Sequence, residues 1–126
     1  MRLLVVEDES LIAYEVACAI EDHLDSEVVA VTTTTSALEM IATRNFDAAI
    51  VDVKLKDGTS ERLAAELLRR SIPYFLLTGC PTQGELPAPL DRGKMLKKPY
   101  EESELIVALA ILAETAWKQN LVTLRQ

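Results

Sequence analysis

The sequence predicts an α/β protein in which a doubly wound, five-stranded parallel sheet has helices on both faces. Short apolar runs recur along the chain, and segments with helical spacing lie between them. The length of 126 residues suits one domain with a single core. Because strands and helices alternate, we expect right-handed crossovers between neighbouring parallel strands.

The expected strands are apolar runs near residues 3–6, 28–31, 48–51, 74–77 and 94–96. Four of these runs are apolar throughout, which is typical of parallel strands that are buried on both faces. With five strands, the flavodoxin-like order 2-1-3-4-5 is the natural arrangement of the sheet.

Most expected helices show an apolar line on one face. In chain order these lines are Ile12, Val16, Ile20 and Leu24, then Leu63 and Leu67, and last Leu105, Leu109, Leu112 and Ala116. The helix after the second strand is expected to begin at Ser36, because Ser36 and Glu39 fit a capping box. The last helix is expected to begin near Glu101, where carboxylates crowd a first turn and suit the helix dipole.

The fourth helix is expected to be short or irregular. Residues 80–89 contain three prolines and a glycine, and proline removes a hydrogen-bond donor and clashes inside a helix. We expect a single domain over residues 1–119, followed by a C-terminal tail over residues 120–126 with no output domain.

The composition limits the partners that we expect. A net charge of -7 and a pI near 4.7 disfavour a nucleic-acid-binding surface, which would need clustered Lys and Arg. No apolar stretch approaches the roughly 20 residues that cross a bilayer, so we expect a cytoplasmic protein with no membrane partner. Two cysteines are too few for a disulfide framework.

Polar residues end the apolar runs where buried strands should meet the edge of the sheet. Glu7 and Asp8 follow the first run, Asp52 the third, Thr78 the fourth and Lys98 the fifth. Ligands of open parallel sheets bind beyond the carboxyl ends of the strands, at the point where the strand order reverses. We therefore expect these five side chains to form one site.

The three carboxylates favour a divalent cation. Each pair of like charges about 4 Å apart costs roughly 4 kcal/mol at an effective dielectric near 20, and one Lys98 cannot offset three carboxylates. Mg²⁺ takes one or two carboxylates and binds phosphate, and the backbone carbonyl of Lys54 could add a ligand. Asp52 then becomes a nucleophile toward phosphorus, with Lys98 and the hydroxyl of Thr78 on phosphoryl oxygens.

These motifs resemble the CheY-like receiver domain of two-component response regulators. The resemblance rests on Glu7-Asp8, Asp52, Thr78 and the pair Lys98-Pro99, in this order and at these intervals. It implies phosphorylation of Asp52 by a histidine kinase or histidine phosphotransfer protein, with Mg²⁺ held by Glu7, Asp8, Asp52 and the Lys54 carbonyl. Such a receiver catalyses only its own phosphorylation and dephosphorylation and is not a free-standing enzyme.

The resemblance extends to a divergent, stand-alone member of the FAT GUY group of receivers. It implies a monomer or weak dimer that signals through altered contacts with an unknown downstream protein, or that serves as a phosphate shuttle or sink. It also implies a kinase-docking surface on the first helix and the loop after the fifth strand. Met95 stands where many receivers have an aromatic switch residue.

Two alternative functions stay open at this point. One is a pseudo-receiver, a binding module that keeps the fold without being phosphorylated. The other is a small Mg²⁺-dependent aspartyl phosphatase, although Lys54 occupies the place where a second Asp would act as general acid.

Overall fold

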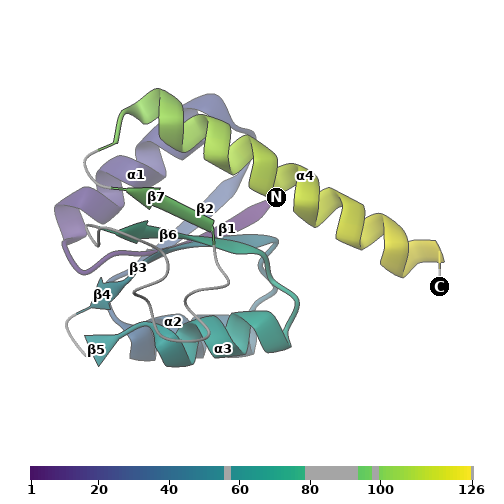
Figure 1. The fold of residues 1–126 in the computed structure, drawn as a ribbon, viewed down its shortest axis with the longest axis horizontal. Coiled ribbons are helices and arrows are strands. Elements are labelled where there is room, and N and C mark those ends of the chain that lie inside the picture. The colour runs from purple at the N-terminus through teal and green to yellow at the C-terminus, as the bar shows by residue number, and fades with distance from the viewer. Residues whose placement is uncertain (56–57, 79–93, 98–99, 126) are drawn as a thin grey trace.

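A five-stranded parallel sheet forms the centre of the protein in the computed structural model (Figure 1), which describes residues 1–55, 58–78, 94–97 and 100–125. The strand order β2-β1-β3-β6-β7 is the predicted flavodoxin-like order 2-1-3-4-5, so this prediction is confirmed. The strands are β1 (Arg2–Val6), β2 (Glu27–Val31), β3 (Ala48–Asp52), β6 (Tyr74–Thr78) and β7 (Lys94–Lys97).

Helices cover both faces of the sheet, which gives three layers (Figure 1). The described helices are α1 (Ser10–His23), α2 (Thr34–Thr43), α3 (Glu61–Arg69) and α4 (Glu102–Arg125). Helices α1 and α4 lie on one face of the sheet, and α2 and α3 lie on the other. The predicted irregular fourth helix, over residues 80–89, falls outside the described residues.

The two faces of the sheet bury separate apolar clusters. One lies toward α2 and α3 and includes Leu63 and Leu67, and the other lies toward α1 and α4 and includes Leu105 and Leu109. Strand β3 is buried at every residue, because it has neighbouring strands on both edges and helices on both faces. Among the side chains that the structure describes, the apolar lines that predicted the helices are therefore the lines that face the sheet.

One local prediction needs correction, and one short element was not predicted. Helix α2 begins at Thr34 rather than Ser36, because the hydroxyl of Thr33 accepts a hydrogen bond from the Ser36 N–H at 3.1 Å and caps the helix. A short antiparallel hairpin, β4 (Lys54–Leu55) with β5 (Gly58–Thr59), also follows β3 and was not expected.

Helix α4 is the longest element of the described chain. It continues through residue 119, where we expect the tail to begin, to Arg125, and its last turns extend past the end of the sheet (Figure 1). The division of the chain at residue 119 stays a prediction. Among the described residues, none of the helices combines the length and apolar character that a bilayer crossing requires.

Candidate functional site

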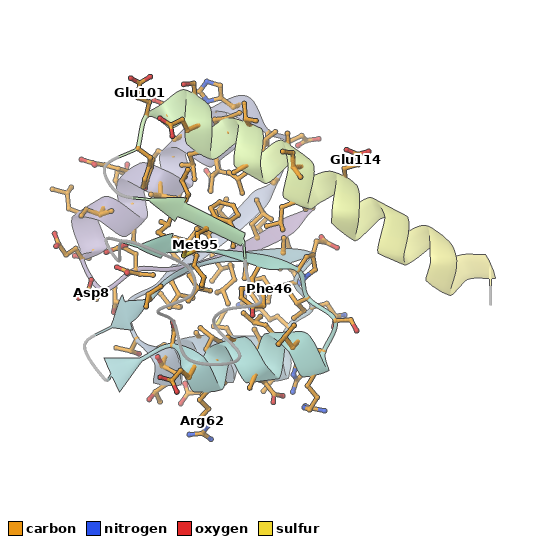
Figure 2. All side chains as sticks on the ribbon, in the orientation of Figure 1. Asp8, Phe46, Arg62, Met95, Glu101 and Glu114 are labelled. Atoms are coloured by element: carbon orange, nitrogen blue, oxygen red, sulfur yellow. The ribbon has the colours of Figure 1, made fainter. Side chains whose placement is uncertain are left out.

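Three carboxylates meet at the carboxyl edge of the sheet. Oxygen atoms of Glu7, Asp8 and Asp52 all lie within 4.8 Å of one another. Glu7 is 1% exposed and Asp52 is 7% exposed, whereas Asp8 is partly exposed. Figure 2 shows Asp8 at the end of the sheet toward which the strand arrows point. The predicted convergence of these residues is therefore observed.

The sheet register explains why these carboxylates meet. Strands β1 and β3 are neighbours, and Val6 pairs with Val51. Glu7, directly after β1, and Asp52, the last residue of β3, therefore lie side by side at the same edge of the sheet. The N–H of Glu7 donates to the carbonyl of Val31 at 3.1 Å, which holds Glu7 to β2 as well. The chain reverses its strand order between β1 and β3, where ligands bind in such sheets.

The charge at this cluster calls for a cation. Coulomb's law gives about 3.5 kcal/mol for two unit charges 4.8 Å apart at an effective dielectric of about 20. Hard divalent cations such as Mg²⁺ take oxygen ligands, and carboxylate oxygens are the donors available here. The residues of this cluster therefore fit the cation predicted from the sequence.

Of the remaining predicted site residues, Thr78 and Lys54 are placed by the positions of their backbones, and Lys98 lies outside the described residues. Thr78 ends β6, one residue beyond the pair of Asp52 with Leu77, so its backbone lies at the same edge. Lys54 begins the hairpin strand β4, two residues after Asp52. Lys98 lies outside the described residues, although its predecessor Lys97 pairs with Thr78 in the sheet. The roles assigned to these three residues stay predictions.

Ser60 is a site-positioning residue that the sequence reasoning missed. It is fully buried, and both its N–H and its hydroxyl donate to the carbonyl of Val53 at 3.2 Å. Ser60 also precedes α3, and its carbonyl accepts from the N–H of Ala64 at 2.9 Å. These bonds tie the start of α3 to the residue directly after Asp52. No local sequence pattern signals this contact, because Ser60 and Val53 are seven residues apart and the Ser60 side chain does not cap α3.

Met95 lies on the sheet face that packs toward α2 and α3. It is partly buried against the apolar cluster on that face, and it pairs with Leu76 of β6 (Figure 2). Methionine is flexible and fills irregular space in cores. Whether this side chain replaces an aromatic switch stays a prediction.

Comparisons with known proteins identify the fold. No protein-family model matches the sequence, and neither does any curated protein. Solved structures do match: the receiver domain of the Francisella response regulator 1452 is 24% identical, with a TM-score of 0.78 over 90% of this chain and 97% of that one. A CheY-like response regulator receiver domain protein from Methanospirillum hungatei is 24% identical, with a TM-score of 0.81 over 94% and 97%.

A sensor protein from Polaromonas is similar at 25% identity, with a TM-score of 0.79 over 91% of this chain and 97% of that one. Matches of this kind cover nearly the whole of each chain, so the likeness extends over the full sheet and its helices. The chain thus has the fold of CheY-like receiver domains, with an acidic cluster at the carboxyl edge of its sheet.

Proposed function

We propose, on the premise that the chain has the CheY-like receiver fold, that it is a response-regulator receiver that accepts a phosphoryl group on Asp52. The observation that carries this proposal is the meeting of Glu7, Asp8 and Asp52 at the point where the strand order reverses. Asp52 is the last residue of the central strand β3, whose neighbours on both sides hold it in place. The fold agrees with a role in two-component signalling.

The donor in this proposal is a phosphohistidine of a histidine kinase or phosphotransfer protein. A carboxylate oxygen of Asp52 forms a bond to phosphorus as the bond from phosphorus to the donor nitrogen breaks. The electron pair of that broken bond stays on the imidazole, which takes up a proton. Catalysis of such a transfer consists mainly of positioning and charge stabilisation.

Each neighbouring residue has a separate part in this transfer. Glu7, Asp8 and Asp52, with the backbone carbonyl of Lys54, would hold Mg²⁺, which supplies positive charge to the carboxylates and to phosphoryl oxygens. Lys98 and the hydroxyl of Thr78 would each bind another phosphoryl oxygen. Ser60 holds the backbone after Asp52 through the Val53 carbonyl, which keeps the nucleophile and the Lys54 carbonyl in fixed relation.

The protein would turn over only its own phosphoryl group and would not act as a free-standing enzyme. Its product is then either an altered surface read by a downstream protein or a phosphoryl group passed on in a phosphorelay. We place this activity in the cytoplasm.

The experiment that tests this proposal is phosphorylation by a small donor. The protein is incubated with Mg²⁺ and acetyl phosphate, and intact mass spectrometry measures the gain of one phosphoryl group. We expect the gain in the wild type and its absence in Asp52→Asn. Asp47→Asn is the matched control, because Asp47 lies before the same strand at the opposite edge and should not change labelling.

The outcomes separate the proposed function from the two alternatives. No gain from acetyl phosphate or from a panel of purified histidine phosphotransfer proteins would favour the pseudo-receiver. Steady release of inorganic phosphate from phosphomonoesters such as p-nitrophenyl phosphate would favour the aspartyl phosphatase. Labelling that persists in Asp52→Asn would place the phosphoacceptor elsewhere.

A further inference from the structure

Ser60 lies at the junction between the loop that follows Asp52 and the first turn of α3. We propose that Ser60 couples cation binding at the acidic cluster to the start of α3, because it holds the backbone that leads to the Lys54 carbonyl. This inference rests on the proposed function, since it takes the Lys54 carbonyl as a ligand of the cation. Ser60 is then a positioning residue, and α3 is the helix whose start responds to the state of the site.

Ser60 occupies the N-cap position of α3 but does not use its side chain as a cap. A serine at this position usually accepts a hydrogen bond from an N–H in the first turn of its helix. In the part of the chain that the structure describes, the Ser60 side chain makes no such bond. Thr33, at the same position of α2, has an extended backbone and does cap its helix, whereas the φ of -89° and ψ of 21° of Ser60 are not extended. The start of α3 therefore forgoes a stabilising contact that its own sequence could supply.

The hydroxyl of Ser60 binds the Val53 carbonyl instead. It donates to this carbonyl at 3.2 Å, and the Ser60 N–H donates to the same oxygen, also at 3.2 Å. One donor is enough to satisfy a buried carbonyl, so the hydroxyl adds a second bond to a carbonyl that already has a partner. Local rules such as helix capping are broken mainly at functional sites, and here the cap is exchanged for a bond to the residue after Asp52.

Val53 is held on both sides of its backbone. Its N–H donates to the carbonyl of Leu77 in β6 at 3.2 Å, and its carbonyl accepts the two bonds from Ser60. Because each peptide unit is planar, these bonds fix the two units that flank Val53. The first unit joins Val53 to Asp52, and the second joins it to Lys54. Only the φ and ψ of Lys54 then remain to set the direction of the Lys54 carbonyl.

The hairpin of β4 and β5 constrains Lys54 in turn. Lys54 pairs with Thr59, the residue directly before Ser60. Figure 1 shows the hairpin between the end of β3 and the start of α3. The Lys54 carbonyl and Ser60 therefore belong to one hydrogen-bonded unit, and a cation bound to the carbonyl acts on the whole unit.

The same unit is joined to α3. Ser60 is fully buried, and its carbonyl accepts from the N–H of Ala64 at 2.9 Å. The side chain of Val53 is 4% exposed and lies in the same apolar cluster as Leu63 and Ala64. A displacement of the backbone at residues 53–54 is therefore passed to the first turn of α3.

Thermodynamic linkage makes this coupling measurable at both ends. Backbone that is already held in the binding geometry loses less conformational freedom when a ligand binds. Coupling between two sites is reciprocal, so a cation that binds more tightly to the intact unit must also stabilise that unit. Loss of the Ser60 hydroxyl should therefore weaken cation binding, and cation binding should reduce local opening at the start of α3.

Amide hydrogen exchange of the full chain, with and without Mg²⁺, tests the effect on α3. The Ala64 N–H bonds to the Ser60 carbonyl, and the Ala37 N–H makes the equivalent bond to the Thr33 carbonyl in α2. At a Mg²⁺ concentration ten times its Kd, exchange of the Ala64 amide should slow about tenfold. Exchange of the Ala37 amide should change little, because the start of α2 is capped by its own Thr33 and lies outside the unit.

Matched substitutions test the effect on the cation. Ser60→Ala should weaken Mg²⁺ binding, measured by isothermal titration calorimetry, about tenfold, as substitutions behind metal ligands commonly do. Ser60→Thr keeps the hydroxyl and should restore the wild-type Kd. Thr33→Ala removes a side-chain hydrogen bond of similar strength and should leave the Kd unchanged, which separates positioning from a general loss of stability.

Three results would overturn the coupling: equal slowing of exchange at Ala64 and Ala37, wild-type Mg²⁺ affinity in Ser60→Ala, or equal weakening of Mg²⁺ binding by Ser60→Ala and Thr33→Ala. The exchange comparison uses the wild type alone, so it decides the question even if a variant does not fold. Labelling of the wild type by acetyl phosphate decides the proposed function separately. No labelling of a chain that binds Mg²⁺ would defeat that function, whereas Mg²⁺ binding that Ser60→Ala leaves unchanged would defeat only the coupling.

Discussion

Removal of the charge on Asp8 should stabilise the protein when no divalent cation is present. Asp8 contributes to two pairs of carboxylates whose oxygens lie within 4.8 Å, and each pair costs about 3.5 kcal/mol at an effective dielectric of about 20. Asp8 is partly exposed, so solvent and salt screen both pairs. We therefore expect Asp8→Asn to raise the free energy of unfolding by about 1 to 2 kcal/mol in EDTA.

Urea denaturation measures this change. At an m-value of about 2 kcal/mol/M, the middle of the range for small proteins in urea, the expected gain moves the midpoint up by roughly 0.5 to 1 M. In the wild type, Mg²⁺ at ten times its Kd should add about 1.4 kcal/mol, because a ligand that binds only the folded state stabilises it. Asp8→Asn should gain much less from the same Mg²⁺ concentration, since one of the three carboxylates is gone.

The control is Glu39→Gln, which removes one negative charge from an exposed position on α2, far from the cluster in the fold. It should change neither the midpoint in EDTA nor the response to Mg²⁺. The reasoning is refuted if Asp8→Asn lowers the midpoint in EDTA, or if Mg²⁺ stabilises the variant as much as the wild type. The first result would mean that the carboxylates do not repel one another strongly, and the second would mean that Asp8 does not help to bind the cation.

Three further predictions concern groups around the site and the helices. Ser60→Ala should lower the free energy of unfolding, measured by urea denaturation, by about 1 kcal/mol, because it removes the buried hydrogen bond from the Ser60 hydroxyl to the Val53 carbonyl. Ser10→Ala, which removes an exposed hydroxyl, is the control. Thr33→Ala should lower the free energy of unfolding by about 1 kcal/mol through loss of the α2 cap. An equal cost for Glu39→Ala, which removes the side chain that a capping box at Ser36 needs, would favour the capping box instead. Hydrogen bonds from Arg69 and Arg70 lower the pKa of Glu66 to about 2. The stabilisation by Glu66 is therefore present above its unfolded pKa near 4.5 and is lost as pH falls toward 2. The difference in urea midpoint between wild type and Glu66→Gln should shrink over that pH range. A constant difference would contradict this prediction.

The order of the sheet could be predicted because its central strands β1, β3 and β6 are buried on both faces. Burial of this kind leaves continuous apolar runs, and β3 shows the consequence most clearly, since every residue from Ala48 to Asp52 is buried. Helix faces were predictable for the same reason: Leu63 and Leu67 lie on the apolar line that packs against the sheet. In these elements the local pattern and the tertiary structure depend on the same burial.

Elements that depend on single hydrogen bonds were harder to predict. The start of α2 depends on a competition between Thr33 and Ser36 for the cap, and both residues have the chemistry of a cap. The hairpin of β4 and β5 has two residues in each strand, too few to show a period in the sequence. Ser60 was missed because its function lies in a contact with Val53, seven residues away, which no local pattern reveals.

The acidic cluster was predictable for a different reason, which is that its carboxylates contradict their buried surroundings. Burial of a carboxylate is costly unless partners compensate it, so Asp52 at the end of β3 and Glu7 after β1 would be poor choices for stability alone. Each residue by itself fits a turn, but two such residues on neighbouring strands share one edge of the sheet through the register of Val6 with Val51. The cost of placing them together is a cost that a bound divalent cation can offset. Residues at which burial and side-chain chemistry disagree are therefore the ones whose function can be inferred from the amino-acid sequence.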